Sequence, residues 1–429
     1  MAIAVFSEYF YGGFIIMKKF LAIALVLMLA LFAFTACGGG EEEATADAAG
    51  YAGQGTAIEG DTIKIGVFEP TTGENGGGGL QEVLGIRYAH SLNNTITIDG
   101  KEYAIELVEV DNQSDKTAAV TAAQSLISSG VVAVVGTYGS GVAIAAGSTF
   151  ADACVPAMGT SCTNPQVTLG NDFYFRVCFL EPFQGTVMAS YAIDEGYTKA
   201  AIISQNGDDY STGLAGFFKT AFEALGGTIV SEQTYQTNES DFNAILTTIK
   251  EAGPDVVFCP SSITTAPLVL QQARDLGLEA IFMAGDTWEN ESMIAAAGDA
   301  SEGIVFSTFF DENDTENPVA AEFVPGFKAY LNANPDALKA NGGTDGVAAV
   351  SALGYDAYMA VYNAILSLDG QGLETITSGD IRDAIPAVNY DGVTGNITFD
   401  ENGDANKEIA YIKTVVDGKI TFLRTQEAK

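Results

Sequence analysis

Short apolar runs alternate with segments of helical periodicity from residue 61 to about residue 285 of this 429-residue chain. The run VVAVV (131–135) lacks polar alternation, as expected for a strand covered on both faces of its sheet. The segment 114–130 places Val120, Ala123 and Ile127 at helical spacing and ends at a glycine. This alternation predicts repeated strand–helix–strand units with parallel strands.

The expected elements form two successive series. The first has strands at 63–68, 103–110, 131–135 and 155–158, with helices at 80–93, 114–130 and 141–152. The second has helices at 183–193, 211–225, 241–253 and 264–276, with strands at 199–204, 227–233, 255–259 and 280–285. Long helices near 318–333 and 345–367 follow, then a strand and turn at 396–404 and the segment EIAYIKTVVDG (408–418). The chain is predicted to be an α/β protein of two doubly wound parallel-sheet lobes, with its ligand in the cleft between them.

Charge and histidine content exclude several classes of function. The formal net charge is −36, whereas nucleic-acid binding needs a basic surface. His90 is the single histidine, so Ser-His-Asp or Cys-His catalysis would have to use it. We interpret His90 as a surface residue at a helix end. No His/Cys spacing typical of a metal site occurs, and we expect neither a metal nor a cofactor.

The N-terminal segment indicates export. Residues 17–37 combine Lys18 and Lys19 with an apolar run that ends in small residues before Cys37. The segment FTAC resembles a bacterial lipobox, which implies lipidation of Cys37; a retained transmembrane anchor is the alternative. We expect a leader over 1–36, with its true start at Met17, and a flexible tether over 37–60. The folded part would then lie outside the cytoplasmic membrane.

Four cysteines follow Cys37 in the sequence: Cys154, Cys162, Cys178 and Cys259. Cys162 and Cys178 lie near two neighbouring expected strands and could form a bridge. Buried free thiols are the interpretation that we favour.

The turn GTYGSG (136–141) joins the strand VVAVV to an expected helix. It lacks the Gly-Lys-Ser/Thr of a phosphate-binding P-loop, the third glycine of the dinucleotide fingerprint, and the G-x-S-x-G of a nucleophile elbow. What remains is the Ser140 hydroxyl and several backbone N–H groups at a helix N-terminus, which suit a carboxylate. A glycine turn built for packing alone is the alternative.

A second polar turn follows the next expected strand, in PAMGTSCTNPQVT (156–168). Consecutive parallel strands are usually neighbours, so Ser161 and Thr163 could present hydroxyls to the same crevice as Ser140. Two hydroxyl-bearing turns at adjacent strand ends predict one polar wall for a small ligand.

Several segments in order resemble one family. They are IGVFEPTTGENG, VEVDNQSDKTAAV, VVGTYGSGVAIAAG, VPAMGTSCTNPQVT, FYFRVCFLEPFQG, NGDDYSTGLAGFF, QQARDLGL and IFMAGDTW. From about residue 61 to 424 the chain resembles the branched-chain amino acid type of periplasmic-binding proteins, the solute receptors of ABC importers. The resemblance implies a type I fold in which a multi-strand hinge joins the lobes. Lobe 1 would hold 61–182 plus 309–390, and lobe 2 would hold 183–308 plus 391–425.

The resemblance also implies roles for individual residues. Ser140 would bind the ligand α-carboxylate, Thr163 both carboxylate and ammonium, and Asp286 the ammonium. The implied ligand-binding residues are Tyr138, Ser140, Ser161, Cys162, Thr163, Tyr210 and Asp286. Asp286 could instead cap a helix over 289–297, and the two tyrosines could simply pack.

The sequence departs from the family pattern at three places. Asp286 is one methylene shorter than the usual glutamate, and the stretch ENGGGG (74–79) predicts a longer loop. Ser262 stands near a position that is usually aromatic, so Trp288 could supply a replacement wall.

The implied function is a non-enzymatic receptor that delivers an amino acid, of branched-chain type, to a membrane ABC permease. The first alternative is the same fold binding a short amide, urea or an aromatic acid. A hydrolase that uses Ser140 and a ligand sensor acting on a membrane kinase are further alternatives.

Overall fold

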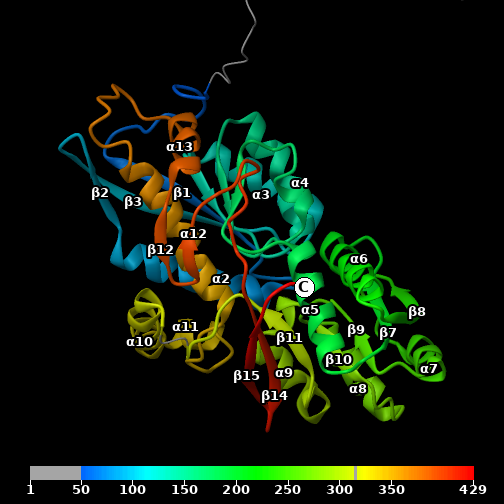
Figure 1. The fold of residues 1–429 in the computed structure, drawn as a ribbon. Helices are drawn as coiled ribbons and strands as arrows, with labels where there is room; N and C mark the ends of the chain where they lie inside the picture. The colour runs from blue at the N-terminus through cyan, green and yellow to red at the C-terminus, as the bar shows by residue number, and fades with distance from the viewer. Residues whose placement is uncertain (1–49, 314–315) are drawn as a thin grey trace, which may run out of the picture. The chain divides into compact units, whose positions relative to one another are not determined.

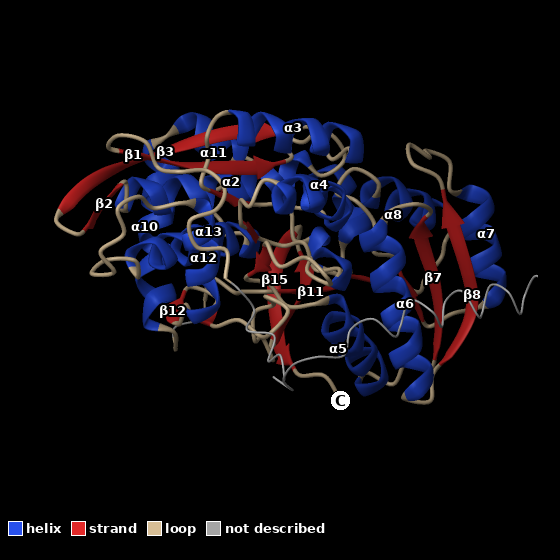
Figure 2. Ribbon diagram, turned by 90° about the horizontal axis from the view of Figure 1, so that it is seen from above, coloured by secondary structure: helices blue, strands red, loops and turns tan. Residues whose placement is uncertain are grey.

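The computed structural model describes residues 50–313 and 316–429, and two large sheets there form two α/β lobes (Figures 1 and 2). The predicted α/β class with two parallel-sheet lobes is confirmed. The leader (1–36), Cys37 and the tether up to residue 49 lie outside the described residues. Within the described part, no helix is both long and apolar enough to span a bilayer.

The sheet of lobe 1 has the strand order β2-β3-β1-β4-β5-β6. Its strands are β1 (Thr62–Glu69), β2 (Thr95–Ile98), β3 (Lys101–Asp111), β4 (Ala133–Val135), β5 (Ala157–Gly159) and β6 (Tyr174–Arg176). All neighbours pair in parallel except β2, which forms a hairpin with β3 at the sheet edge. The hairpin turns at Asp99 and Gly100, both with positive φ, as the Asp-Gly pair favours.

Alternating residues of β1 decide which helices cover each face of this sheet. Ile63, Ile65 and Val67 belong to one buried cluster with α2 (Gly76–Leu92) and α12 (Ala349–Leu366). Phe68 belongs to a second cluster with α3 (Lys116–Ser128) and α4 (Ser140–Asp152). Both faces are therefore covered, which explains why the strands read as continuous apolar runs.

The sheet of lobe 2 has the strand order β15-β14-β11-β10-β9-β7-β8. Its strands are β7 (Lys199–Gln205), β8 (Thr228–Tyr235), β9 (Val256–Phe258), β10 (Ile281–Ala284), β11 (Val305–Thr308), β14 (Ala410–Val416) and β15 (Lys419–Gln426). Its helices are α5 (Glu181–Asp194), α6 (Asp209–Ala224), α7 (Asn243–Ala252), α8 (Ala266–Asp275) and α9 (Glu291–Ala297). The first five strands along the chain are parallel, and β14 and β15 add an antiparallel edge.

The chain passes between the sheets three times, after β6, after β11 and before β14. After β11 it adds α10 (Pro318–Ala333), α11 (Pro335–Ala340), α12, α13 (Ser378–Ala384) and the hairpin of β12 (Tyr390–Gly392) and β13 (Gly395–Ile397). The Asp356 carboxylate of α12 accepts 2.8 Å hydrogen bonds from the backbone N–H groups of Val393 and Thr394. Residues 391–397 therefore pack with lobe 1, so the boundary expected at residue 391 is too early.

The third crossing is fixed to lobe 1 by a buried arginine. Arg176 Nε lies 2.5 Å from Asp404 Oδ1, and its Nη1 donates to the carbonyl oxygens of Cys162 (2.7 Å) and Asn164 (2.6 Å). Its side chain is fully buried. One guanidinium thus holds both the crossing segment and the turn that follows β5.

Residues 50–60 correct the expected tether. The ring of Tyr51 packs against Phe173, and the backbone N–H of Thr56 donates a 2.9 Å hydrogen bond to Ser378 Oγ. The backbone N–H of Ile58 donates to Ile376 O at 2.9 Å. A few aromatic and backbone contacts attach this polar stretch to lobe 1, although its composition predicts a free tether.

The expected loop 74–79 is also corrected, because Gly76–Gly79 form the first turn of α2. A Cβ on Gly78 would lie 2.4 Å from the Tyr138 ring, and one on Gly79 would lie 2.0 Å from Pro70 O. These glycines therefore serve close packing of the helix start rather than loop freedom.

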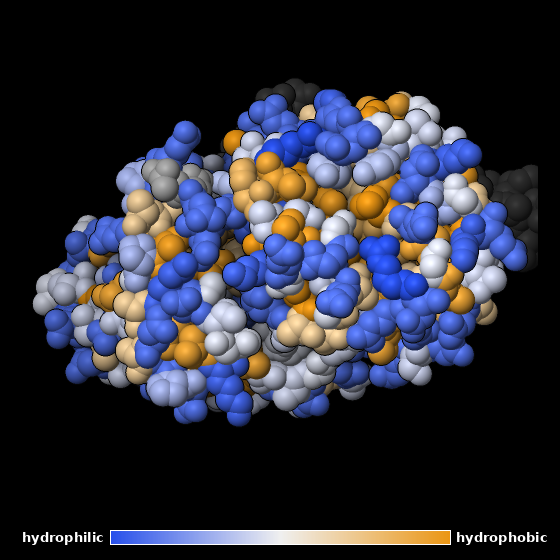
Figure 3. Space-filling model, turned by 90° about the horizontal axis from the view of Figure 1, so that it is seen from below, coloured by the Kyte–Doolittle hydropathy of each residue, from blue (hydrophilic) through white to orange (hydrophobic). Residues whose placement is uncertain are grey.

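The four cysteines of the described part are free thiols, which agrees with the interpretation that we favoured over a bridge of Cys162 and Cys178. The face drawn in Figure 3 is mostly hydrophilic, with hydrophobic residues in small scattered groups. Such scattered groups are normal for a protein surface and indicate no particular partner.

We predict that Gly85→Ala destabilises the fold by about 1–3 kcal/mol or more, because α2 and α12 meet there without space. A Cβ on Gly85 would lie 1.9 Å from Ser351 O. The control is Gly216→Ala in α6, where a Cβ meets nothing within 4 Å. That change is expected to stabilise the helix by about 0.5–1 kcal/mol. Chemical denaturation of both variants measures the difference, and equal effects would contradict the packing argument.

We also predict that Arg176→Ala costs about 3–5 kcal/mol, because it leaves the Asp404 carboxylate buried without its cation. The matched control is Arg87→Ala, whose ion pair with Glu109 (2.6 Å) is 47% exposed on the arginine side. This change is expected to cost less than about 1 kcal/mol. Urea unfolding curves of the two variants test the contrast, and a small effect at Arg176 would refute it.

Candidate functional site

A cavity of about 630 Å³ lies where the carboxyl ends of the strands of both lobes meet, as expected for open parallel sheets. From lobe 1 it is lined by Gly73, Glu74, Asn75, Gln113, Ser114, Asp115, Lys116, Tyr138, Gly139, Ser140, Gly141, Val142 and Ser161. From lobe 2 it is lined by Gln205, Gly207, Asp208, Tyr210, Thr237, Asn238, Ser262, Thr264, Asp286 and Thr287. Five of the predicted binding residues therefore meet in one cavity: Tyr138, Ser140, Ser161, Tyr210 and Asp286.

The turn GTYGSG carries Ser140 to the first position of α4. Gly139 is the N-cap, with a φ of 96° that only glycine adopts readily. A Cβ on Gly136 would lie 2.2 Å from Phe68 O, so this glycine serves the contact with β1. Packing thus explains Gly136, and the helix start explains Gly139. The third glycine of the turn, Gly141, lies beside Lys116, where a Cβ would come within 2.9 Å of the lysine side chain.

Ser140 is prepared to donate a hydrogen bond. Its Oγ accepts a 3.0 Å hydrogen bond from the backbone N–H of Asn164, and its side chain is buried at the cavity wall. The hydroxyl proton is then free to face a ligand oxygen. The first N–H groups of α4 have no partner within the helix and point in the same direction. Together they form a site suited to a carboxylate.

The second turn contributes one residue to the cavity rather than three. Ser161 Oγ is buried at the cavity wall, and no described residue partners it with good hydrogen-bond geometry. Cys162 and Thr163 do not line the cavity. Thr163 Oγ1 lies 3.5 Å from Glu181 Oε1, and Cys162 is fully buried. The expected ligand contacts of Cys162 and Thr163 are thus not supported, since the Thr163 hydroxyl faces α5 and the Cys162 side chain is buried in lobe 1.

Asp286 presents a buried carboxylate to the cavity from lobe 2. Its Oδ1 accepts hydrogen bonds from Gln184 Nε2 (2.8 Å) and from the Tyr210 hydroxyl (3.1 Å). Only 3% of the residue is exposed, and it forms no ion pair within the described residues. Burial raises the pKa of Asp286 to about 6, against the opposing effect of the Gln184 hydrogen bond.

The alternative role of Asp286 as a helix cap is wrong. The N-cap of α9 is Asn290, whose side chain accepts from the backbone N–H groups of Ser292 and Met293. Asp286 lies instead in a short 3-10 helix, Asp286–Trp288. Its carboxylate is therefore available to the cavity.

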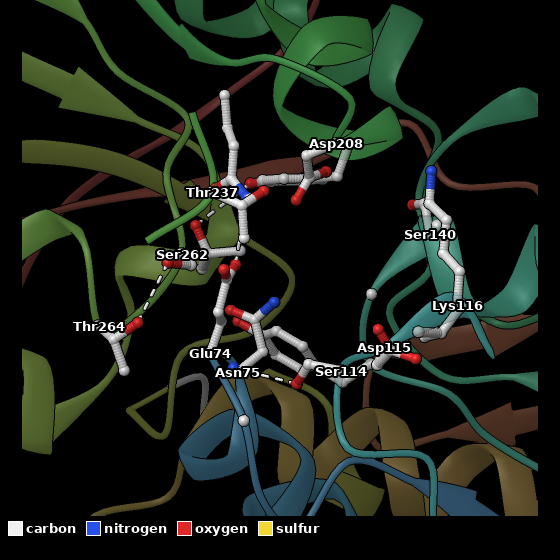
Figure 4. A pocket seen from close by; sticks show the side chains of 18 of the residues that line it. Glu74, Asn75, Ser114, Asp115, Lys116, Ser140, Asp208, Thr237, Ser262 and Thr264 are labelled. Atoms are coloured by element: carbon white, nitrogen blue, oxygen red, sulfur yellow. Dashed lines mark hydrogen bonds between the residues drawn. The ribbon is translucent and has the colours of Figure 1, made fainter. Parts of the chain in front are cut away.

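The expected replacement wall at Trp288 is not present. Trp288 is fully buried, does not line the cavity, and donates from Nε1 to Ser261 Oγ at 3.2 Å. Ser262 does line the cavity, on the side that Figure 4 shows with Thr264. The 3-10 helix Asp286–Trp288 directs the indole into the core, where it packs among buried residues.

Sequence reasoning missed a buried pair of acids behind the cavity. The Thr160 hydroxyl lies 2.5 Å from Glu82 Oε2 and 3.3 Å from Glu69 Oε1, and the backbone N–H of Tyr138 donates to Glu69 Oε2 at 2.7 Å. Burial raises the pKa of Glu82 to about 7 and holds the pKa of Glu69 well above its ordinary value. The pair therefore retains a proton near neutral pH.

One sequence signal pointed toward this pair. Glu69 stands at the end of an apolar strand, where a charged residue is unusual. Glu82 offers no such signal, because glutamate is common in helices. A third buried acid, Glu181 of α5, accepts from Asn164 Nδ2 at 3.1 Å. Burial also holds its pKa well above the ordinary value.

Among the residues that the structure describes, the cavity holds no Ser-His pair. His90 does not line the cavity, and its Nε2 lies 2.9 Å from Ile105 O. It is half-buried at the end of α2, so the expected surface position is correct only in part.

Comparison with known proteins supports the two-lobed α/β fold described above. A family model described as periplasmic binding protein matches residues 62–419. The Leu/Ile/Val-binding protein homolog 1 of Brucella suis is 29% identical over 374 residues, covering 84% of this chain and 93% of that protein. A crystal structure of a leucine-binding protein from Thermotoga maritima is 32% identical with a TM-score of 0.76, covering 85% of this chain and 99% of that one.

A second solved structure has similar coverage. It is the branched-chain amino acid transporter substrate-binding protein of Streptococcus pneumoniae in complex with isoleucine. It is 28% identical with a TM-score of 0.74, and the match covers 85% of this chain and 99% of that chain. The two-lobed fold, the cleft between the lobes and the family match together place this chain in the periplasmic binding protein family.

Proposed function

We propose that this protein is an extracytoplasmic receptor that binds an α-amino acid in the cleft and delivers it to an ABC permease. The observation that carries the proposal is Asp286, a buried carboxylate that lines the cavity and has no cation among the described residues. A buried charge is costly unless it is paired. The α-ammonium group of a ligand would supply the missing partner.

The opposite end of the cavity suits the ligand α-carboxylate. The Ser140 hydroxyl and the N-terminus of α4 offer hydrogen-bond donors there. Lys116 lines the same side of the cavity (Figure 4). A zwitterion therefore fits with its anion on lobe 1 and its cation on lobe 2.

This arrangement couples binding to closure of the lobes. Lys116 Nζ lies 2.8 Å from Asp209 Oδ2 across the cleft, with side chains that are 50% and 39% exposed. Exposed ion pairs contribute little to stability, so this pair alone holds the lobes together only weakly. A ligand that bridges Ser140 and Asp286 favours the closed form and shifts the equilibrium toward it.

The similarity to relatives named for Leu, Ile and Val favours an amino acid of branched-chain type. The cleft geometry supports the ammonium and carboxylate sites more directly than it supports any side chain. We further propose lipid attachment at Cys37, which follows from the leader sequence. An aromatic acid, urea or a short amide would leave Asp286 without a cation. A sensor would use the same binding site.

We predict that Asp286→Asn weakens binding of an α-amino acid by about 2–5 kcal/mol, because it removes one partner of a buried charge pair. Isothermal calorimetry is performed on protein unfolded and refolded to remove carried-over ligand, with the twenty amino acids, acetamide and urea as titrants. The control is Asp275→Asn at the exposed end of α8, which is expected to leave affinity unchanged.

Binding of acetamide or urea that is unaffected by Asp286→Asn would refute the ammonium role and favour the amide ligand. Hydrolysis of an ester or amide that is lost in Ser140→Ala would favour the enzyme alternative. Thermal melting of each variant checks that it folds.

We predict that affinity for the amino acid falls as pH drops below about 6, where the Asp286 carboxylate of the free protein gains a proton. The raised pKa means that the ionised form, which the ammonium group needs, predominates only above that value. The loss approaches about tenfold per pH unit for a single coupled proton. Calorimetry from pH 4.5 to 8 measures the profile, and Asp286→Asn should flatten it. A profile that is flat in the unmodified protein would contradict the assignment.

A further inference from the structure

The part of the cavity beyond Ser140 and Asp286 has an unusual lining for an alkyl side chain. Val142 is the single aliphatic residue among the described residues that line the cavity. The polar and charged residues of this part are Glu74, Asn75, Gln205, Asp208, Thr237, Asn238, Ser262 and Thr264. An alkyl group placed here would displace water from these groups without replacing its hydrogen bonds.

Gln205 is held in one orientation by its neighbours. Its Oε1 accepts a 3.2 Å hydrogen bond from the Tyr235 hydroxyl, and the side chain is 4% exposed. The Nε2 group therefore faces the cleft, where it donates to Thr237 Oγ1 (3.1 Å) and to Glu74 Oε2 (3.3 Å). Glu74 comes from lobe 1 and Gln205 from lobe 2, so this contact crosses the cleft.

The charges of the lining are not balanced. Lys116 pairs with Asp209. The carboxylates of Asp115 and Asp208 accept backbone N–H groups as caps of α3 and α6. Glu74 has neither role, since it forms no ion pair within the described part of the chain and accepts a hydrogen bond from the neutral Gln205 amide.

Four carboxylates line the cavity without an ion pair among the described residues: Glu74, Asp115, Asp208 and Asp286. Asp115 and Asp208 are helix caps, which leaves Asp286 and Glu74 with neither a cation nor a capping role. Figure 4 shows Glu74 and Asp208 between the side of Ser262 and Thr264 and the side of Ser140 and Lys116. Burial raises the pKa of both Glu74 and Asp208, because it disfavours the charged form of each carboxyl group. The α-ammonium group of an amino acid can neutralise only one of the unpaired carboxylates.

We infer that the ligand is an α-amino acid with a positively charged side chain, whose donors bind Glu74 and the hydroxyl and amide groups around it. This inference rests on the proposed function and narrows it. It replaces the branched-chain side chain expected from the relatives with a basic one. The Asp286 site holds the backbone end of the ligand, and Glu74 selects its side chain.

The test compares L-lysine, L-arginine, L-glutamine and L-leucine by calorimetry on the full chain after removal of carried-over ligand. Lysine or arginine is expected to bind at least about tenfold more tightly than leucine or glutamine. Glu74→Gln is expected to weaken binding of the basic amino acid by at least about tenfold and to change leucine affinity less than twofold. Glu279→Gln, at an exposed turn, is the matched control and should change neither.

Each other outcome overturns a specific step. Tighter binding of leucine would refute the basic side chain while leaving the amino acid receptor intact. Tighter binding of glutamine would refute the requirement for positive charge. An unchanged preference in Glu74→Gln, with a melting curve like that of the unmodified protein, would remove Glu74 from selection. Binding of no amino acid at all would refute the proposed function together with this inference.

Discussion

The shared direction of the parallel strands is the constraint on which this structure depends. In each lobe the central strands run the same way, so every loop at their carboxyl ends reaches one edge of the sheet. The two edges face the same cavity, which is why Ser140 and Asp286 meet although they are far apart in the sequence. Within lobe 1, Gly85 lets α2 approach the backbone of α12 directly.

The site is built at some expense of stability. The raised pKa of Asp286, about 6 compared with 3.8, corresponds to about 3 kcal/mol of stability lost at neutral pH. The group contributes less to folding when it is ionised, so this loss is absent at pH values below its ordinary pKa. The raised pKa values of Glu69 and Glu82 lower stability at neutral pH in the same way, and Glu69 accepts the hydrogen bond of the Tyr138 backbone N–H. A local loss of stability of this kind is typical of binding sites.

The repeating strands and helices could be predicted from the sequence, because apolar runs and helical spacing both mark elements buried in a layered fold. The place of Ser140 in the cavity was also accessible from the residues, since it follows a predicted strand, whereas Tyr210 and Asp286 were expected from the family resemblance. The short strands β6 and β11 were missed because three or four residues carry little periodicity. The direction in which a side chain points was even harder to predict from the sequence. Trp288 and Thr163 stand beside cavity residues but turn inward, and only packing decides that.

Segments of low apolar content were the other failure. Residues 50–60 read as a tether because composition measures how much surface a segment can bury on its own. Composition does not predict that a segment will attach to a surface formed by the rest of the chain. Tyr51, which lies against Phe173, and Thr56, bonded to Ser378, make that attachment.

The two ends of the described fold are attached to different lobes. Residues 50–58 are held on lobe 1, whereas the backbone N–H of Lys429 donates to Ser190 Oγ of α5 in lobe 2 at 3.3 Å. Any opening of the cleft therefore changes the separation of the chain ends. Energy transfer between dyes attached near residue 50 and near residue 429 would therefore report the opening angle of the hinge. Neither dye would lie in the cleft. A pulling force applied near residue 50 would act on lobe 1, and lobe 2 could still rotate about the hinge.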